Sequence, residues 1–398
     1  VPAPRGVPMT AATLVHERVR LRMGVEARAL VIVTAILLAF GLAVLYSASA
    51  YEAMRAGRPG AYFFLRQLLG AGAGVLLFML CAKLDPERWR THGWPVMLVA
   101  IGAMIATILP GMSETYGSRR FLFGSGLQPS EFAKLAVVIW TAMLVVKKGE
   151  AGLQRMSRGL LPFLAVIGVL SAVAYAQPDY SVVGHFVLLM AVVLFAGGAR
   201  IGHFIFLGVL AVPALWAFVG TSGYARDRII AFLNPMAAAS ADKLYQLTQS
   251  LVAAGSGGLF GVGFGEGRQQ MGYVLFSYTD FVGSIIAEEW GLLGMVFVTA
   301  LYAVYGALGF RIAAQAVSPF QRLVAVGLTV NLLVTAYVHL GVVIGLLPTT
   351  GLTLPFISYG RSNLLLSLLS TGILCAIGSQ RERVLGAQAT DPLAVAVR

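Results

Sequence analysis

The sequence predicts an all-α integral membrane protein with about ten transmembrane helices. Hydrophobic residues make up 58% of its 398 residues and charged residues only 12%, whereas soluble globular domains carry roughly 25% charged residues. Apolar blocks of about 20 residues recur along the chain, and each is long enough to cross the ~30 Å hydrocarbon core of a bilayer. Both observations exclude a soluble globular fold.

The apolar blocks divide the chain into a basic N-terminal tail (1–26), a membrane domain (27–380) and a C-terminal tail (381–398). One predicted outer connection, 220–280, is much longer than the others. Its amphipathic run LYQLTQSLVAAG predicts one or two short helices at the outer membrane surface. The predicted spans are residues 28–49, 62–82, 94–110, 129–146, 159–176, 180–198, 201–219, 281–310, 321–346 and 358–379.

The net charge of +12 follows a membrane pattern and does not indicate binding to nucleic acid. With the N-terminus placed in the cytoplasm, more than half of the 29 Lys and Arg residues fall in inner segments. The positive-inside rule then predicts that both termini are cytoplasmic. The expected partner of the excess charge is anionic lipid.

Several common sites are not indicated by the sequence. Cys81 and Cys375 lie in apolar helices far apart in the chain, so we expect two small core residues and no disulfide. The Gly-rich run 255–267 lacks the GK[ST] ending and the strand–helix context of a phosphate-binding loop. No HExxH motif, His pair or Cys/His cluster predicts a zinc site.

The stretch FSYTDFVGSIIAEEWG (276–291) holds three of the chain's 17 acidic residues, Asp280, Glu288 and Glu289. We expect one helix from Asp280 to Phe310, whose first ten residues project above the hydrocarbon core or line a cavity. Two roles for Asp280 stay open, a helix N-cap and an ionised carboxylate that accepts a proton or holds a divalent cation. Glu288 and Glu289 are expected to face the interior and to pair with an arginine of a neighbouring helix.

A second constellation is LQPSEFAKLAVVIW (127–140). Glu131 and Lys134 lie one turn apart on one helix face, where they are expected to pair. This pair either fixes the position of the helix or belongs to an active site. Arg119 and Arg120, just before the helix, suit phosphate recognition or belong to an ordinary solvated loop.

Three further features lie at the predicted outer side. Arg66, at the edge of the second span, either extends to the interface or faces a site. Asp179, in QPDYS (177–181), has the composition of a turn. The segment GLLPTTGLTLPFISYGRSN (345–363) predicts a cavity wall, because irregular backbone at membrane depth must be covered by protein or reached by water. An outward polar cavity of this kind suits a lipid-linked phosphate substrate, whereas a proton-coupled transporter would place its acids near the midplane.

Five blocks resemble, in order, the signature blocks of the SEDS family of bacterial membrane proteins, whose members are FtsW, RodA and SpoVE. The resemblance spans residues 28 to about 380, and its last block is more similar to the FtsW and SpoVE branch than to RodA. The blocks are YGSRRFLFGSGLQPSEFAK, QPDYS, YQLTQSLVAAGSGGLFGVGFGEGRQ, TDFVGSIIAEEWGLLG and GLLPTTGLTLPFISYG.

This resemblance implies an inverting peptidoglycan glycosyltransferase of the bacterial cytoplasmic membrane, with its active site on the outer face. Such an enzyme transfers glycan from an undecaprenyl-pyrophosphate-linked donor to the 4-OH of lipid II, for cell division or cell shape. Its implied partners are a class B penicillin-binding protein (a transpeptidase) and other divisome or elongasome proteins. Its implied cofactor is a divalent cation, Mg²⁺ or Mn²⁺.

The resemblance also implies site residues. Asp280 is the expected catalytic residue, acting as general base directly or through the metal it binds. The expected substrate-binding residues are Arg66, Gln67, Arg119, Arg120, Gln128, Ser130, Glu131, Lys134, Asp179, Gln246, Gln249, Ser250 and Ser358.

The chain departs from the family pattern at two places. The family usually has Pro-Glu-x-His before the TD pair, where this chain has Leu275, Phe276, Ser277 and Tyr278. It usually has SYGGSS where this chain has SYGRSN, so that Arg361 replaces a glycine. Two other functions therefore stay open, a non-catalytic scaffold for division proteins and a lipid II flippase.

Overall fold

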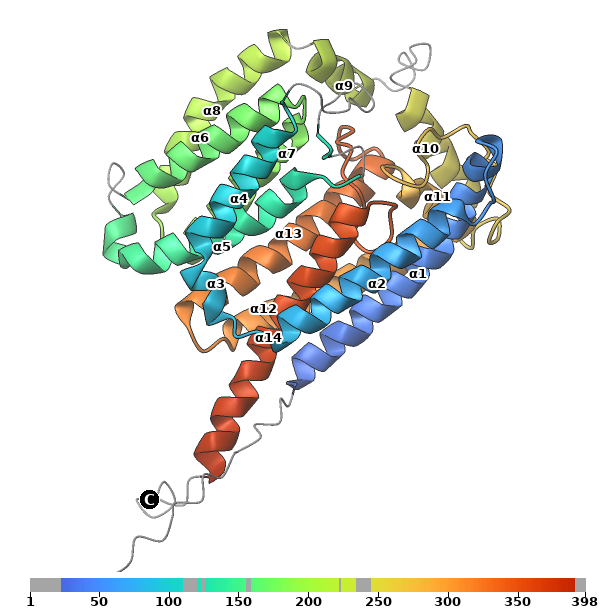
Figure 1. The fold of residues 1–398 in the computed structure, drawn as a ribbon. Coiled ribbons are helices and arrows are strands. Elements are labelled where there is room, and N and C mark those ends of the chain that lie inside the picture. Colours follow the sequence, from blue (N-terminus) through green and yellow to red (C-terminus); the bar gives the residue numbers. More distant parts are fainter. Residues whose placement is uncertain are drawn as a thin grey trace, which may run out of the picture.

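The computed structural model describes residues 23–109, 120–122, 126–154, 159–221, 223–233 and 245–390. The regular elements in these ranges are helices, apart from one isolated bridge between Leu122 and Leu127. The predicted all-α fold is therefore confirmed (Figure 1). The helices are α1 (Val25–Arg55), α2 (Tyr62–Lys83), α3 (Glu87–Thr91), α4 (Gly93–Ala106), α5 (Pro129–Leu153), α6 (Leu161–Ala176), α7 (Tyr180–Ala196), α8 (Ile201–Thr221), α9 (Gly223–Leu233), α10 (Tyr245–Gly257), α11 (Val282–Glu289), α12 (Gly291–Ala314), α13 (Pro319–Val343) and α14 (Arg361–Thr390).

Within the described residues, six helices are long and apolar enough to cross a membrane: α1, α2, α5, α12, α13 and the part of α14 up to Ser379. The shorter apolar helices α4, α6 and α7 and the first part of α8 occupy the other predicted spans. Each of the ten predicted spans thus contains an apolar helix, and the protein is a multi-pass membrane protein. The number of crossings, the tails and the sidedness of the termini stay predictions.

Proline sets the first turn of two enclosed helices. Pro129 begins α5 and Pro319 begins α13, at positions where the missing N–H costs nothing. Ser318 caps α13 by accepting the N–H of Gln321 (3.2 Å). A residue before proline favours extended backbone, and Gln128 is accordingly held out of α5 with φ −105° and ψ 107°. This places the Gln128 side chain at the end of the helix bundle.

Helices α5 and α14 lie in the middle of the bundle. Most residues of α5 and of α14 up to Ser379 are buried, whereas few residues of α2 are. Helix α14 packs along α2, α4 along α5, and α12 along α13. At one end of the bundle, α9, α10 and α11 gather around the α13–α14 connection, residues 344–360 (Figure 1). The start of α5 reaches the same end, so these elements share one site.

The predicted continuous helix over 281–310 is wrong. Helix α11 ends at Glu289, and α12 begins at Gly291 as a separate helix. Gly291 has a φ of +64°, and a Cβ added there would overlap the backbone of Gly261. Only glycine tolerates both conditions, so the close approach of a second chain segment breaks the helix here.

That second segment is the glycine-rich segment, residues 258–270. Its backbone bonds to both sides of the break: the N–H of Leu292 donates to the carbonyl of Gly258 (2.9 Å), and the N–H of Val262 donates to the carbonyl of Glu288 (3.0 Å). The groups that a broken helix leaves without partners are therefore satisfied by another part of the chain.

Candidate active site

Asp280 lies half-buried in the turn directly before α11. Its neighbour Phe281 is the N-cap residue of α11, so the capping hypothesis for Asp280 is wrong. Phe281 packs against Val342 and Val343 at the end of α13. On the other side, Oδ2 of Asp280 lies 3.6 Å from the place that a Cβ on Gly351 would take. The carboxylate thus lies between the start of α11 and the α13–α14 connection.

Two guanidinium groups act on the charge of Asp280. Withdrawal from water raises the pKa of the Asp280 carboxyl, the cations of Arg120 and Arg228 counteract this rise, and the Asp179 carboxylate adds to it. Arg228 is anchored by a hydrogen bond from its Nη1 to the carbonyl oxygen of Thr349 (2.6 Å). The site therefore combines a carboxylate of increased proton affinity with cations suited to anionic oxygens.

Asp179 supplies the second carboxylate. It is buried at the start of α7, and its Oδ2 accepts a hydrogen bond from Nε2 of Gln128 (3.1 Å). Burial raises the pKa of Asp179, while the cations of Arg120 and Lys134 oppose the rise. Asp179 is thus more than the turn former that its Pro-Asp sequence indicates, because it faces the same charges as Asp280.

The predicted pair of Glu131 and Lys134 is confirmed on the buried face of α5. Nζ of Lys134 lies 2.6 Å from Oε1 of Glu131, and Lys134 is 1% exposed. A buried ammonium requires such a partner. Ser130, one residue earlier, is also buried, and within the described part of the chain its hydroxyl has no hydrogen-bond partner. Since both ions act on Asp179, the pair belongs to the same cluster.

The α13–α14 connection forms a wall beside Asp280, as its irregular sequence predicts. Ser358 fixes this wall, because its Oγ donates to the carbonyl oxygen of Thr279 (2.7 Å). Gln67 on α2 donates in turn to the carbonyl oxygen of Ser358 (2.9 Å). These contacts make Gln67 and Ser358 supports of the backbone on which Asp280 stands.

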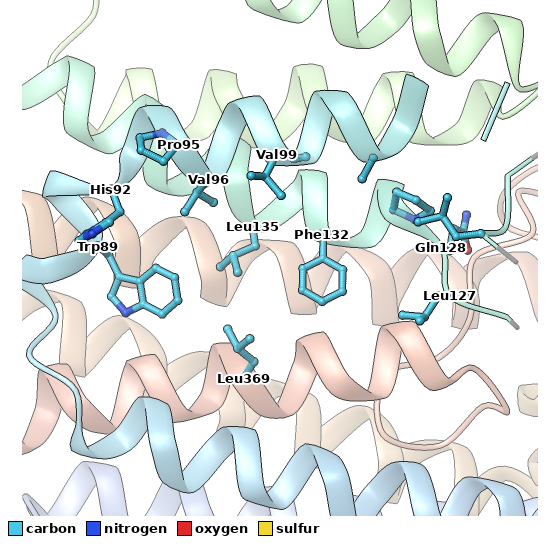
Figure 2. A pocket seen from close by; sticks show the side chains of 14 residues that line it. Trp89, His92, Pro95, Val96, Val99, Leu127, Gln128, Phe132, Leu135 and Leu369 are labelled. Carbon is cyan, nitrogen blue, oxygen red and sulfur yellow. The ribbon is translucent and has the colours of Figure 1, made fainter. Parts of the chain in front are cut away.

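An apolar groove of about 490 Å³ runs between α4, α5 and α14 (Figure 2). Trp89 and His92 lie at one end, and Leu127 and Gln128 at the other. Gln128 also binds Asp179, so an apolar chain in the groove would direct a polar end group toward the carboxylates. The rest of the lining is Pro95, Val96, Val99, Ala100, Ala103, Leu122, Pro129, Phe132, Leu135 and Leu369.

Comparison with known proteins identifies the fold that carries this site. The family model described as the cell cycle protein family FtsW/RodA/SpoVE matches residues 28–383. The chain belongs to this family.

Relatives of the family cover nearly the whole chain. A probable peptidoglycan glycosyltransferase FtsW of Trichlorobacter lovleyi is 35% identical over 353 residues, which are 88% of this chain and 92% of the relative. The stage V sporulation protein E of Bacillus subtilis is 36% identical and covers 87% of this chain and 94% of the relative. The predicted family resemblance is therefore confirmed.

Solved structures of the family agree in fold. A chain of a peptidoglycan synthase complex, solved to explain the structural coordination of polymerization and crosslinking, matches with a TM-score of 0.73 at 26% identity, over 89% of this chain and 98% of that chain. The rod shape determining protein RodA of Thermus thermophilus matches with a TM-score of 0.64 at 27% identity, over 89% and 96%.

One of the predicted arginines, Arg66, falls outside this cluster. Arg66 is exposed, and its Nη1 donates to the hydroxyl of Tyr62 (2.5 Å) with the guanidinium against the Tyr62 ring. Arg119 lies outside the described residues. Of the arginines that the family resemblance implied, the structure therefore brings Arg120 to Asp280.

The predicted residues on α10 support the site from outside. Ser250 donates to the carbonyl oxygen of Val343 (2.9 Å), and Gln246 reaches the carbonyl oxygen of Leu275 (3.5 Å). Gln249 is half-buried on the same helix. Through these contacts α10 holds the end of α13 and the segment before Asp280.

Glu288 and Glu289 bind backbone, and the expectation of an arginine from a neighbouring helix is wrong. Glu288 accepts the N–H groups of Arg268 (2.9 Å) and Gln269 (3.2 Å). Glu289 accepts the N–H of Gly265 (3.1 Å). Both carboxylates are buried, as expected; their backbone partners lie in the glycine-rich segment, and Glu289 also accepts the hydroxyl of Ser47 on α1.

In the part of the chain that the structure describes, the donor atoms near Asp280 do not form a complete metal cage. Among the residues that the structure describes, no three His, Cys, Asp or Glu side chains are grouped to hold a metal ion. Mg²⁺ is commonly bound through one or two carboxylates together with phosphate oxygens and water. The residues present therefore fit a cation that is shared between Asp280 and a phosphate-bearing substrate.

Two residues of the site were not identified from the sequence. Arg228 lies within the long predicted connection 220–280, where no spacing distinguishes it from other charged residues. His339 lies inside the predicted span 321–346, and its ring contacts both Gly283 and Leu352. The signal for His339 was present, because an ionisable residue within an apolar span marks a functional position.

Proposed function

We propose that this family member is a peptidoglycan glycosyltransferase that polymerises lipid II at the outer face of the bacterial cytoplasmic membrane. The proposal is carried by one observation: an apolar groove meets a cluster of carboxylates and guanidiniums at Gln128. A substrate with a long apolar chain and a diphosphate head matches both parts. The peptidoglycan glycosyltransferase activity in the name of the FtsW relative supports the same reaction.

Asp280 is the general base in this proposal. Its carboxylate takes the proton of the acceptor 4-OH, whose oxygen attacks the anomeric carbon of the donor glycan. The β-1,4 bond forms as the bond between that carbon and the diphosphate oxygen breaks, and the diphosphate leaves with the electron pair. The raised pKa of Asp280 favours this role, because a base is most effective when its pKa is near the working pH.

Arg120 and Arg228 stabilise the negative charge that develops on the departing diphosphate. The prenyl chain of one substrate lies in the groove between α4, α5 and α14. A Mg²⁺ or Mn²⁺ ion held by Asp280 and the diphosphate would supply further charge neutralisation when bound.

A class B penicillin-binding protein is the proposed partner. The support is the fold match to a chain of a peptidoglycan synthase complex in which polymerization is coordinated with crosslinking. In such an assembly the new glycan passes to a transpeptidase. Other division or elongation proteins and anionic lipids complete the proposed surroundings.

The test is lipid II polymerisation by the purified protein with its class B partner, for wild type and Asp280→Asn, with and without EDTA. The control is Asp85→Asn, the same chemical change at an exposed residue between α2 and α3. We expect glycan from wild type and from the control and none from Asp280→Asn. Equal amounts of glycan from wild type and Asp280→Asn would mean that another residue is the general base. No glycan from a folded wild-type complex would favour the scaffold function.

A further inference from the structure

His339 lies on α13 with its imidazole buried beneath the candidate active site; the residue is 1% exposed. Its Nε2 lies 3.3 Å from the backbone nitrogen of Gly283, and its Nδ1 lies 2.7 Å from the carbonyl oxygen of Leu352. One ring thus joins two segments that are about 70 residues apart in the sequence.

The two contacts determine the state of the ring. The N–H of Gly283 requires an acceptor, and the carbonyl of Leu352 requires a donor. A neutral imidazole with its hydrogen on Nδ1 offers both at once, whereas Lys and Arg only donate and an ionised carboxylate only accepts. A Cβ on Gly283 would press against the ring at 3.3 Å from Nε2, so the glycine gives the imidazole its close position.

The joined segments are the two sides of the Asp280 position. Gly283 lies three residues after Asp280, at the start of α11. Leu352 follows Gly351, which faces Oδ2 of Asp280. Packing of Phe281 on Val342, close to His339 on α13, holds the same turn from below. His339 therefore sets the separation between the carboxylate and the wall opposite it.

We propose that His339 is a positioning residue for the polymerase reaction, holding the start of α11 and the α13–α14 connection at the spacing that Asp280 requires. This inference rests on the proposed function of Asp280. The imidazole does not touch substrate. It acts through backbone, so its loss changes the rate of the chemical step more than substrate affinity.

The test compares His339→Phe, which keeps a ring without donor or acceptor, with His339→Gln, whose amide has both. Thr329→Val is the matched control, because Thr329 is also buried on α13 and its hydroxyl has no hydrogen-bond partner in the described part of the chain. Glycan synthesis gives kcat and KM for each variant. Hydrogen exchange of peptides that cover 279–285 and 350–354 reports the two joined segments without any need for activity.

We expect His339→Phe to lower kcat by about 10- to 100-fold with KM nearly unchanged, and to speed exchange about 10-fold in both segments. His339→Gln should recover part of both losses, and Thr329→Val should behave as wild type. If the Phe variant does not fold, His339→Asn replaces it, because its shorter amide reaches only one partner.

Faster exchange with an unchanged kcat would overturn the positioning role, as would a change in KM alone. Unchanged exchange in both segments would show that the imidazole does not join them. A wild-type protein that makes no glycan would overturn the proposed function and, with it, the effect of His339 on kcat. The exchange data would still decide whether the imidazole joins the two segments.

Discussion

Asp280 and the pair Glu288–Glu289 stand within ten residues of each other, yet they have different surroundings. Asp280 is half-buried, and the charges that act on it belong to the side chains of Arg120, Arg228 and Asp179. Glu288 and Glu289 are each 2% exposed and accept N–H groups of the glycine-rich segment. The first carboxylate faces groups that a substrate can displace or share; the other two are bound by backbone N–H groups and, for Glu289, also by the Ser47 hydroxyl.

This difference in partners distinguishes a carboxylate that can take part in a reaction, Asp280, from two carboxylates that hold the fold, Glu288 and Glu289. A carboxylate that accepts backbone N–H groups must lose these bonds before it can bind a substrate or take a proton from one. A carboxylate whose charge is balanced by side-chain cations can exchange these partners for a substrate. The distance in sequence from the apolar run does not tell these two kinds of carboxylate apart. The groups that face each carboxylate do.

The largest effect that would test the comparison is expected at Asp280. Asp280→Asn should lower glycan synthesis by about 10²- to 10⁴-fold, the usual contribution of general base catalysis. Its melting temperature should stay equal or rise at neutral pH. The reason is that the raised pKa makes the ionised carboxylate unfavourable for the folded state, a cost that disappears below the ordinary pKa of aspartate. A large fall in melting temperature would place Asp280 with the structural carboxylates.

A second test concerns the break between α11 and α12. A Cβ on Gly261, whose φ is +82°, would overlap the backbone carbonyl of Glu289. Gly261→Ala should therefore destabilise the fold by about 2–4 kcal/mol, measured by thermal unfolding in detergent. Gly255→Ala is the control, since a Cβ there meets no heavy atom within 4 Å. Equal stability of both variants would contradict the described packing.

Glu288 gives a smaller effect on stability. Glu288→Gln replaces one acceptor oxygen by an NH2 group that cannot accept the backbone N–H groups of Arg268 and Gln269, and should cost about 1–3 kcal/mol of unfolding free energy. Glycan synthesis per folded molecule should stay at the wild-type level at low temperature. A loss of activity without a loss of stability would mean that Glu288 takes part in the reaction, and would contradict the distinction drawn between Glu288 and Asp280.

The smallest effect is a shift in pH dependence. The base must be ionised, so activity should fall on acidification through the raised pKa of Asp280. The Arg228 cation lowers that pKa; its removal in Arg228→Gln should raise the pKa and move the acid limb of kcat/KM to higher pH. The measurement is the pH profile of glycan synthesis, and a limb that moves to lower pH or stays in place would contradict the assignment.

Hydrophobic pattern alone predicted the class of the fold, because ten apolar blocks leave few alternatives for a membrane protein. The pair of Glu131 and Lys134 was also predictable, since both lie on one helix and their spacing sets their distance. The broken helix at Gly291 was not, because the cause lies in a segment 30 residues earlier whose backbone enters the break. Arg228 and Gly351 reach Asp280 through tertiary contacts that no local spacing records.

The glycine-rich segment has a consequence for genetics. Its backbone and the end of α10 lie so close to the α11–α12 break that added methyl groups at Gly257 of α10, at Gly261 or at Gly291 of α12 would overlap main-chain atoms. Substitutions there weaken the backbone contacts that hold the two helices at the break, and they leave the reacting groups intact. In a living cell such alleles would permit wall growth in the cold and fail on warming, so a screen for conditional mutants would return this loop, while a screen for dominant inactive enzyme would return Asp280.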